Sequence, residues 1–315
     1  MDDMDTGIDE NSRVIGRDGK ADWYLYTGQD EDDIPLSVKR LIVDPSVTEL
    51  TKEIFSGVLS NIKHLELWEG LQSIEKGTFS HCKELISVSL QLDTVFDEAF
   101  DRCMLEEVVF GPNVKRIGGC AFRGCCLRVI DIPSTVKEIG YGAFNSCVDL
   151  KEVILCDGLE QIQNGAFCKC RKLKSISVPS TVERIQSNTF RGCHRLEEVI
   201  LPEGLSKIGD KAFLSCKSMK GIKIPTRVTE IPDSAFSGCG KLKTIALHDN
   251  TTSIGAWAFS DSGLEFSIPP GVTNIARSTF RRCSKLTKID LHDDIVSIGE
   301  DAFFGTGFEV MTIPP

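Results

Sequence analysis

The sequence lacks the features that would place a chain in a membrane or mark it for export. It contains no run of roughly 18 apolar residues, the length that a membrane-spanning helix needs, so we expect no membrane insertion. The first residues, Met1 to Asp5, are acidic, and neither a basic segment nor an apolar core follows them as a secretory signal requires. These absences predict a cytoplasmic location.

Sequence signatures of catalysis and of nucleic-acid binding are also missing. The chain has no phosphate-binding G-x-x-x-x-G-K-[ST] loop, no H-E-x-x-H motif and no G-x-S-x-G motif. It has no cluster of lysines and arginines in sequence, and its net charge is −10, so we expect no nucleic-acid partner. We therefore predict a protein that is not an enzyme, has no catalytic residues and uses no cofactor.

The negative charge is concentrated at the N-terminus. Residues 1–33 hold eleven acids and three bases, whereas residues 34–315 hold 35 acids and 33 bases. We interpret residues 1–33 as an acidic, solvated leader that is partly disordered. Within it, residues 23–27 (Trp-Tyr-Leu-Tyr-Thr) are suited to a strand that caps the first repeat. The alternative is an acidic arm that contacts a basic partner.

Phenylalanine recurs at a nearly fixed interval along the rest of the chain. Successive members are 21 to 24 residues apart, and such a period predicts stacked supersecondary units in place of a single closed core. The twelve residues are Phe55, Phe79, Phe100, Phe122, Phe144, Phe167, Phe190, Phe213, Phe236, Phe259, Phe280 and Phe303.

Each unit has the pattern of a short strand followed by a turn. Leu150, Val153 and Leu155 illustrate the L-x-x-V-x-L alternation of a strand with one buried side. A proline often follows the strand and ends it, because proline has no N–H for a ladder. The pair Ala166–Phe167 suits a single helical or 3₁₀ turn on the outer side. One unit cannot bury its apolar positions alone, so we expect stacking to bury them.

Three segments carry a resemblance to a known family. Residues 132–147 (I-P-S-T-V-K-E-I-G-Y-G-A-F-N-S-C), 178–193 and 224–239 resemble the BspA-type leucine-rich repeat. The resemblance covers about residues 34–315, as about twelve repeats of about 23 residues. It implies a repeat solenoid, a leucine-rich-repeat right-handed superhelix that is mainly β, with short parallel strands on the concave face. It also implies an alternative role, a surface or secreted adhesion protein, and with it an extracellular or cell-surface location.

The thirteen cysteines are mostly explained by the repeat. Nine of them lie three residues after a repeat Phe, where a small buried hydrophobe is wanted, and a continuous column of thiols has no natural disulfide pairing. We predict free, reduced thiols. Of the other four (Cys120, Cys126, Cys156 and Cys168), none has the paired spacing of a structural zinc site, so we predict no metal centre.

The outward-facing strand positions are the candidate binding residues. Glu107, Glu152 and Glu198 recur on alternate turns, each beside an aliphatic residue. We predict a non-catalytic protein-interaction or scaffold module that binds a basic, partly apolar peptide or protein on its concave strand face. The alternative is that exposed strand positions tolerate any residue. The predicted site comprises Glu107, Val109, Asp131, Glu152, Ile154, Glu198, Ile200 and Lys223.

Two further expectations concern the histidines and the C-terminus. His248 and His292 share one repeat position two turns apart, roughly 10 Å, which is too far for one metal ion. The sequence ends at residues 311–315 (M-T-I-P-P), directly after an expected thirteenth strand, which would leave an unpaired edge unless Pro314 and Pro315 block it. We therefore expect weak end-to-end self-association through this end.

Overall fold

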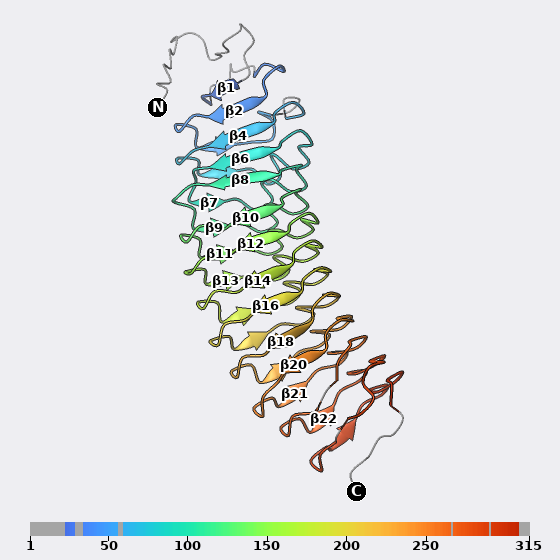
Figure 1. Ribbon diagram of the computed structural model, residues 1–315. Coiled ribbons are helices and arrows are strands. Elements are labelled where there is room, and N and C mark those ends of the chain that lie inside the picture. The colour runs from blue at the N-terminus through green and yellow to red at the C-terminus, as the bar shows by residue number, and fades with distance from the viewer. Residues whose placement is uncertain (1–22, 29–33, 56–58, 266, 290, 309–315) are drawn as a thin grey trace, which may run out of the picture.

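The computed structural model describes residues 23–28, 34–55, 59–265, 267–289 and 291–308. Within these residues the chain forms one long, bent stack of coils that starts at β1 and continues without interruption past β22 (Figure 1). Most of the acidic leader and residues 311–315, at the expected thirteenth strand, lie outside the described residues.

Two rows of parallel strands run along the stack. One consists of strands of three or four residues and is called the long row, and the other consists of strands of two residues and is called the short row. The long row contains β1 (Trp23–Tyr26), β2 (Arg40–Val43), β4 (His64–Leu67), β6 (Ser87–Leu90), β8 (Glu107–Phe110), β10 (Val129–Asp131), β12 (Glu152–Ile154), β14 (Ser175–Ser177), β16 (Glu198–Ile200), β18 (Gly221–Lys223) and β20 (Thr244–Ala246). The short row contains β3 (Glu49–Leu50), β5 (Ser73–Ile74), β7 (Thr94–Val95), β9 (Arg116–Ile117), β11 (Glu138–Ile139), β13 (Gln161–Ile162), β15 (Arg184–Ile185), β17 (Lys207–Ile208), β19 (Glu230–Ile231), β21 (Ser253–Ile254), β22 (Asn274–Ile275) and β23 (Ser297–Ile298).

Strand pairing follows the order of the repeats. The long row begins with the sheet β1-β2-β4-β6-β8 and continues as the pairs β10-β12, β14-β16 and β18-β20. Every pair is parallel, and equivalent positions of successive repeats face each other, as in Ile130↔Val153. The fold class predicted from the sequence, a mainly β parallel solenoid, is confirmed.

The strand β1 covers the N-terminal end of the stack. It pairs in parallel with β2 along its full length, so the strand expected over residues 23–27 is present. The ring of Tyr26 lies 5.8 Å from that of Phe55, and Tyr26 itself is buried. The first repeat is therefore covered by an aromatic side chain from outside the Phe series.

The twelve repeat phenylalanines form one continuous column of rings. Centroids of successive rings are 5.3 to 5.9 Å apart, and from Phe79 to Phe303 the successive ring planes are within 15° of parallel. The first eleven are fully buried, and Phe303 is half-buried. Each ring is covered by the rings of the preceding and the following repeat, so burial of this column depends on the stacking of repeats.

Hydrogen-bonded turns surround each Phe, where the sequence predicted a single helical or 3₁₀ turn. Around Phe122, residues Cys120 and Gly124 have φ of 53° and 73°. The N–H groups of Cys120 and Phe122 donate to the carbonyls of Tyr141 (2.7 Å) and Ala143 (2.9 Å) in the next repeat. Left-handed residues on both sides of the Phe interrupt the run of right-handed dihedrals that a helix requires. The described residues accordingly contain no α- or 3₁₀-helix. The outer side instead has single turns, each closed by a bond such as that from the N–H of Cys125 to the carbonyl of Phe122.

Several repeats have glycine four residues before the Phe, because the preceding repeat leaves no room for a side chain there. A Cβ built on Gly140 would lie 2.7 Å from backbone atoms of Gly118 and Gly119 in the preceding repeat. Gly209 and Gly299 meet similar backbone contacts at 2.4 and 2.7 Å. These glycines allow successive coils to pack closely.

The cysteines that follow the phenylalanines are buried, and all thirteen cysteines are free thiols. The nine buried members of the repeat series are Cys82, Cys103, Cys125, Cys147, Cys170, Cys193, Cys216, Cys239 and Cys283. Cys120 and Cys168 are also buried, whereas Cys126 and Cys156 are half-buried.

Candidate functional site

The outward positions of the long strands form a continuous exposed surface, which we call the strand face. In β12 the side chains of Glu152 and Ile154 are exposed and Val153 is buried between them, and β16 repeats this alternation with Glu198, Val199 and Ile200. The strand pattern L-x-x-V-x-L predicted this alternation. The face is therefore built from two exposed columns, one from each outward position.

Strand register places the predicted site residues in these two columns. Glu152 is opposite Val129, and Glu198 is opposite Ser175. In the second column Ile154 is opposite Asp131, and Ile200 is opposite Ser177. The first column runs Glu107, Val129, Glu152, Ser175, Glu198 and Gly221, and the second runs Val109, Asp131, Ile154, Ser177, Ile200 and Lys223.

The three glutamates of the first column are evenly spaced and unneutralised. Each is separated from the next by one intervening strand, so Glu107, Glu152 and Glu198 recur at roughly 10 Å along the stack. All three are exposed, and none forms an ion pair with another residue in the described part of the chain. They form a row of carboxylates open to an incoming cation.

Aliphatic side chains accompany the glutamates in the second column. Val109, Ile154 and Ile200 are 47%, 42% and 54% exposed. Val129 in the first column is exposed to a similar degree. A ligand on this face would therefore meet carboxylates and aliphatic groups together.

The lysine at the end of the site has a partner of its own. Nζ of Lys223 lies 2.6 Å from Oε1 of Glu203, and both side chains are largely exposed. Lys223 thus places a positive charge at the end of the second column, where the acidic surface ends. Asp131, in the same column, is exposed.

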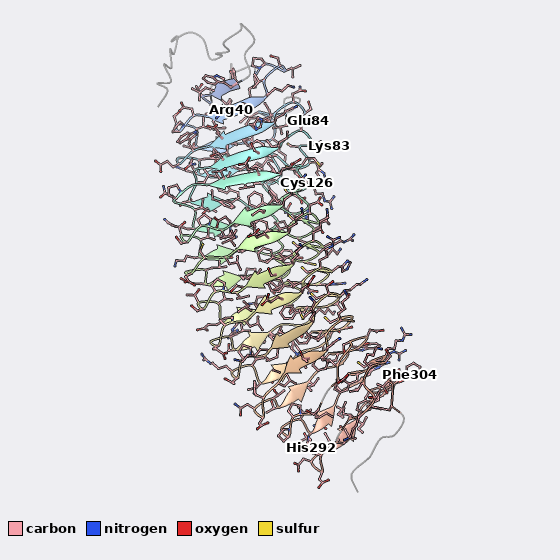
Figure 2. The ribbon with its side chains drawn as sticks, viewed as in Figure 1. Arg40, Lys83, Glu84, Cys126, His292 and Phe304 are labelled. Carbon is pink, nitrogen blue, oxygen red and sulfur yellow. The ribbon has the colours of Figure 1, made fainter. Side chains whose placement is uncertain are left out.

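A shallow depression of about 270 Å³ continues the strand face toward the N-terminus. Its floor includes Ser87 and Ser89 of β6, and Glu107 and Val109 lie at one end. At the other end Arg40 forms an ion pair with Glu66, and Nδ1 of His64 is 2.8 Å from Oγ of Ser87. The predicted site did not include Arg40, which is labelled near the N-terminal end of the stack in Figure 2, because its position relative to the repeat becomes clear only from strand pairing.

The two repeat-position histidines have structural roles. Nε2–H of His248 donates to the carbonyl of Pro225 at 3.1 Å, and Nε2–H of His292 donates to that of Pro269 at 3.2 Å. Each histidine therefore links its turn to the preceding one. Across the residues that the structure describes, no group of three or more His, Cys, Asp or Glu side chains is placed to hold a metal ion.

Helices of the length and apolarity needed to cross a bilayer do not occur among the described residues.

The chain matches the family model for the BspA-type leucine-rich repeat region, which contains six copies of the repeat. The matches cover residues 36–128, 115–239 and 206–315, and so include nearly all of the stack. No curated protein matches the chain at a significant level.

Solved structures share the fold. A leucine-rich repeat protein from Bacteroides ovatus is 23% identical, with a TM-score of 0.58 over 91% of this chain and 87% of that one. The pneumococcal vaccine antigen PcpA is 19% identical, with a TM-score of 0.56 over 88% of this chain and 72% of that one. A leucine-rich cell surface protein from Faecalibacterium prausnitzii is 23% identical, with a TM-score of 0.51 over 89% and 86% of the two chains.

Proposed function

The chain belongs to the BspA-type leucine-rich repeat family, and from this premise we propose that it is a non-catalytic module that binds a basic, partly apolar protein segment on its strand face. This type of repeat is typical of proteins that mediate protein interactions and of adhesin-like surface proteins. The observation that carries the proposal is the row Glu107, Glu152 and Glu198, with an exposed aliphatic side chain beside each glutamate.

The spacing of the carboxylates favours a ligand of a particular shape. A polyproline II segment has three residues per turn and advances about 9.3 Å in that turn. Every third side chain of such a segment therefore lies on the same side. The distance between these side chains is close to the distance between successive glutamates of the row. A segment with lysine or arginine at every third position would pair with each carboxylate in turn, and aliphatic residues between them would cover Val109, Ile154 and Ile200.

This proposal can be tested with a defined peptide. The probe is a fluorescein-labelled peptide of four Lys-Leu-Pro repeats, and its anisotropy is measured with the full chain. We expect the triple variant Glu107→Lys, Glu152→Lys, Glu198→Lys to weaken binding by at least about tenfold, or about 1.4 kcal/mol. A peptide of four Ser-Leu-Pro repeats measures the contribution of the lysines.

The matched control reverses three exposed glutamates away from the strand face: Glu53→Lys, Glu183→Lys and Glu230→Lys. This variant has the same net charge as the triple variant and should bind like the unmodified chain. Equal weakening in both variants would show only a general charge effect. Unchanged affinity in the strand-face variant would remove the strand face as the site.

The second candidate is adhesion at a cell surface. It is supported by family membership and by the likeness in fold to the Faecalibacterium cell surface protein. Fractionation of the native source distinguishes the two candidates. Recovery at the surface or in the medium would favour adhesion, and recovery in the cytoplasm would favour an intracellular scaffold.

A further inference from the structure

Basic side chains gather along one long edge of the stack, outside the strand face. This edge consists of the residues between each Cys position and the next long strand in six consecutive turns: 126–128, 148–151, 171–174, 194–197, 217–220 and 240–243. It carries ten bases and two acids, although the repeat region as a whole has nearly equal numbers of each. We call it the basic edge. Its bases are Arg128, Lys151, Arg171, Lys172, Lys174, Arg195, Lys217, Lys220, Lys241 and Lys243.

Folding alone brings these residues together. They precede the strands from β10 to β20, which lie in consecutive turns, so the basic edge is roughly 24 Å long at about 4.8 Å per turn. In Figure 2, the labels for Lys83, Glu84 and Cys126 mark this long edge, and nitrogen-tipped side chains project from the same margin beyond Cys126. The sequence has no basic cluster because each turn contributes only one to three bases.

Most of these bases have no acidic partner. Lys172 pairs with Asp149, Lys220 pairs with Glu197, and Arg128 lies 3.9 Å from Glu106. The other seven bases form no ion pair with any residue that the structure describes.

Glu197 shows how a carboxylate is held on this edge. Its pKa is lowered first by the hydrogen bond from Lys220 and the charge of Lys220, and then by the charges of Lys241 and Lys174. One carboxylate therefore interacts with lysines from the preceding turn and from the two turns that follow its own. The same environment is available to carboxylates from another chain at the positions where the bases are unpaired.

The neighbouring surfaces limit what kind of polyanion fits. Glu152 and Glu198 directly follow the edge in sequence and would repel a wide polyanion such as duplex nucleic acid. The edge contains no Phe, Tyr or Trp on which single-stranded bases could stack. Exposed apolar side chains lie at its N-terminal end: Val148 within the edge is 39% exposed, Met104 in the turn before it is 48% exposed, and Sγ of Cys126 lies 3.8 Å from Sδ of Met104.

We propose that the basic edge binds an extended, acidic polypeptide segment with apolar residues at the end that meets Met104 and Val148. At about 3.3 Å per residue, roughly seven extended residues span the edge. The carboxylates of the segment pair with the bases that have no acidic partner, and the apolar end of the segment covers Met104 and Val148. This surface is separate from the strand face and does not depend on the function proposed above.

The probe for this surface is a fluorescein-labelled peptide of about eight glutamates followed by two leucines, a length that covers the edge. Binding to the full chain is compared with binding to the variant Lys174→Glu, Lys217→Glu, Lys241→Glu, Lys243→Glu. We expect the variant to bind at least about tenfold more weakly, and binding to the unmodified chain to weaken as salt is raised. A variant with glutamine at the same four positions should show a smaller loss in the same direction.

The control variant Lys115→Glu, Arg184→Glu, Lys207→Glu, Arg227→Glu has the same net charge, and its four altered residues are exposed and outside the edge. It should bind the peptide as the unmodified chain does. Absence of peptide binding, or equal loss in both reversal variants, overturns the proposal. A single-stranded oligothymidylate or phosphatidylserine vesicles bound more tightly than the peptide, with loss only in the edge variant, would also overturn it and assign the edge to that ligand.

Discussion

The thiol of Cys147 donates a hydrogen bond to the backbone carbonyl of Phe122, one repeat earlier, at 3.0 Å. The same carbonyl accepts the N–H of Cys125 within its own repeat at 3.2 Å. Equivalent thiol-to-Phe bonds recur from Cys103 to Cys283. The cysteine column therefore ties successive coils together in addition to filling space, and Ser262 occupies the equivalent position in the Phe259 repeat.

These buried thiols predict a loss of stability at alkaline pH. Burial raises the pKa of Cys147 to about 12 and that of Cys239 to about 12, from an ordinary value of 9.0. Unfolded thiols lose protons near pH 9.0 whereas the folded ones keep them, so the stability that these thiols contribute is fully present below that pH and is lost toward pH 12. Denaturant titrations at neutral pH and at steps above pH 9.0 measure this fall. The variant Cys147→Ser, Cys239→Ser should show a shallower fall, and a flat profile in the unmodified chain would contradict the assignment.

The ring column predicts a large effect of removing a central Phe. Phe190→Ala should lower the free energy of unfolding by about 3–5 kcal/mol, because it leaves a cavity between two stacked rings. The matched control is Phe304→Ala, since Phe304 is 54% exposed and the Arg281 guanidinium carbon lies 4.6 Å from its ring centroid. The control should cost about 1 kcal/mol or less. Comparable losses in both variants would argue against the column as the main source of stability.

Thr251 is a buried polar residue in a column that is otherwise aliphatic. It occupies the position eight residues before the Phe, and its buried Oγ1 has no hydrogen-bond partner among the described residues. Thr251→Val should therefore raise the free energy of unfolding by about 1 kcal/mol, because an unsatisfied hydroxyl is replaced by a methyl group. The neighbouring Thr252 is exposed, and its hydroxyl donates to the carbonyl of Thr229. Thr252→Val should therefore not raise the free energy of unfolding. Destabilisation by Thr251→Val would show that its hydroxyl has a role the packing does not reveal.

Much of the fold could be predicted from the sequence because its apolar pattern is periodic. The interval between phenylalanines predicted the ring column, and the alternation around Val153 predicted which strand side chains face outward. The aromatic stretch at Trp23–Tyr26 predicted the capping strand. Each of these depends on burial, which a single sequence expresses directly as residue type.

The turns around the phenylalanines could not be predicted in the same way. Left-handed positions two residues from the Phe are filled by glycine in some repeats, but by residues such as Glu98 and Lys211 in others. Their conformation is imposed by backbone hydrogen bonds to the next repeat, as the N–H of Lys211 donates to the carbonyl of Asp233 at 3.0 Å. Local propensity does not contain that information.

The basic edge was missed for a related reason. Its residues are scattered over six repeats, and a net charge taken along the sequence averages them with acids on other faces. Summing charge by repeat position instead of along the chain would have found it, once the repeat was aligned. The strand-face glutamates, in contrast, share one repeat position in three strands, so the aligned repeat predicts their row directly.

The most direct test of the account is to locate a bound ligand on the strand face. A photoreactive benzoylphenylalanine is placed at position 154, in the centre of the strand face, and separately at position 183, among the short strands. Each protein is irradiated with the peptide of four Lys-Leu-Pro repeats and analysed by mass spectrometry. We predict a peptide adduct at position 154 and none at position 183. An adduct at position 183 with none at position 154 would contradict binding on the strand face.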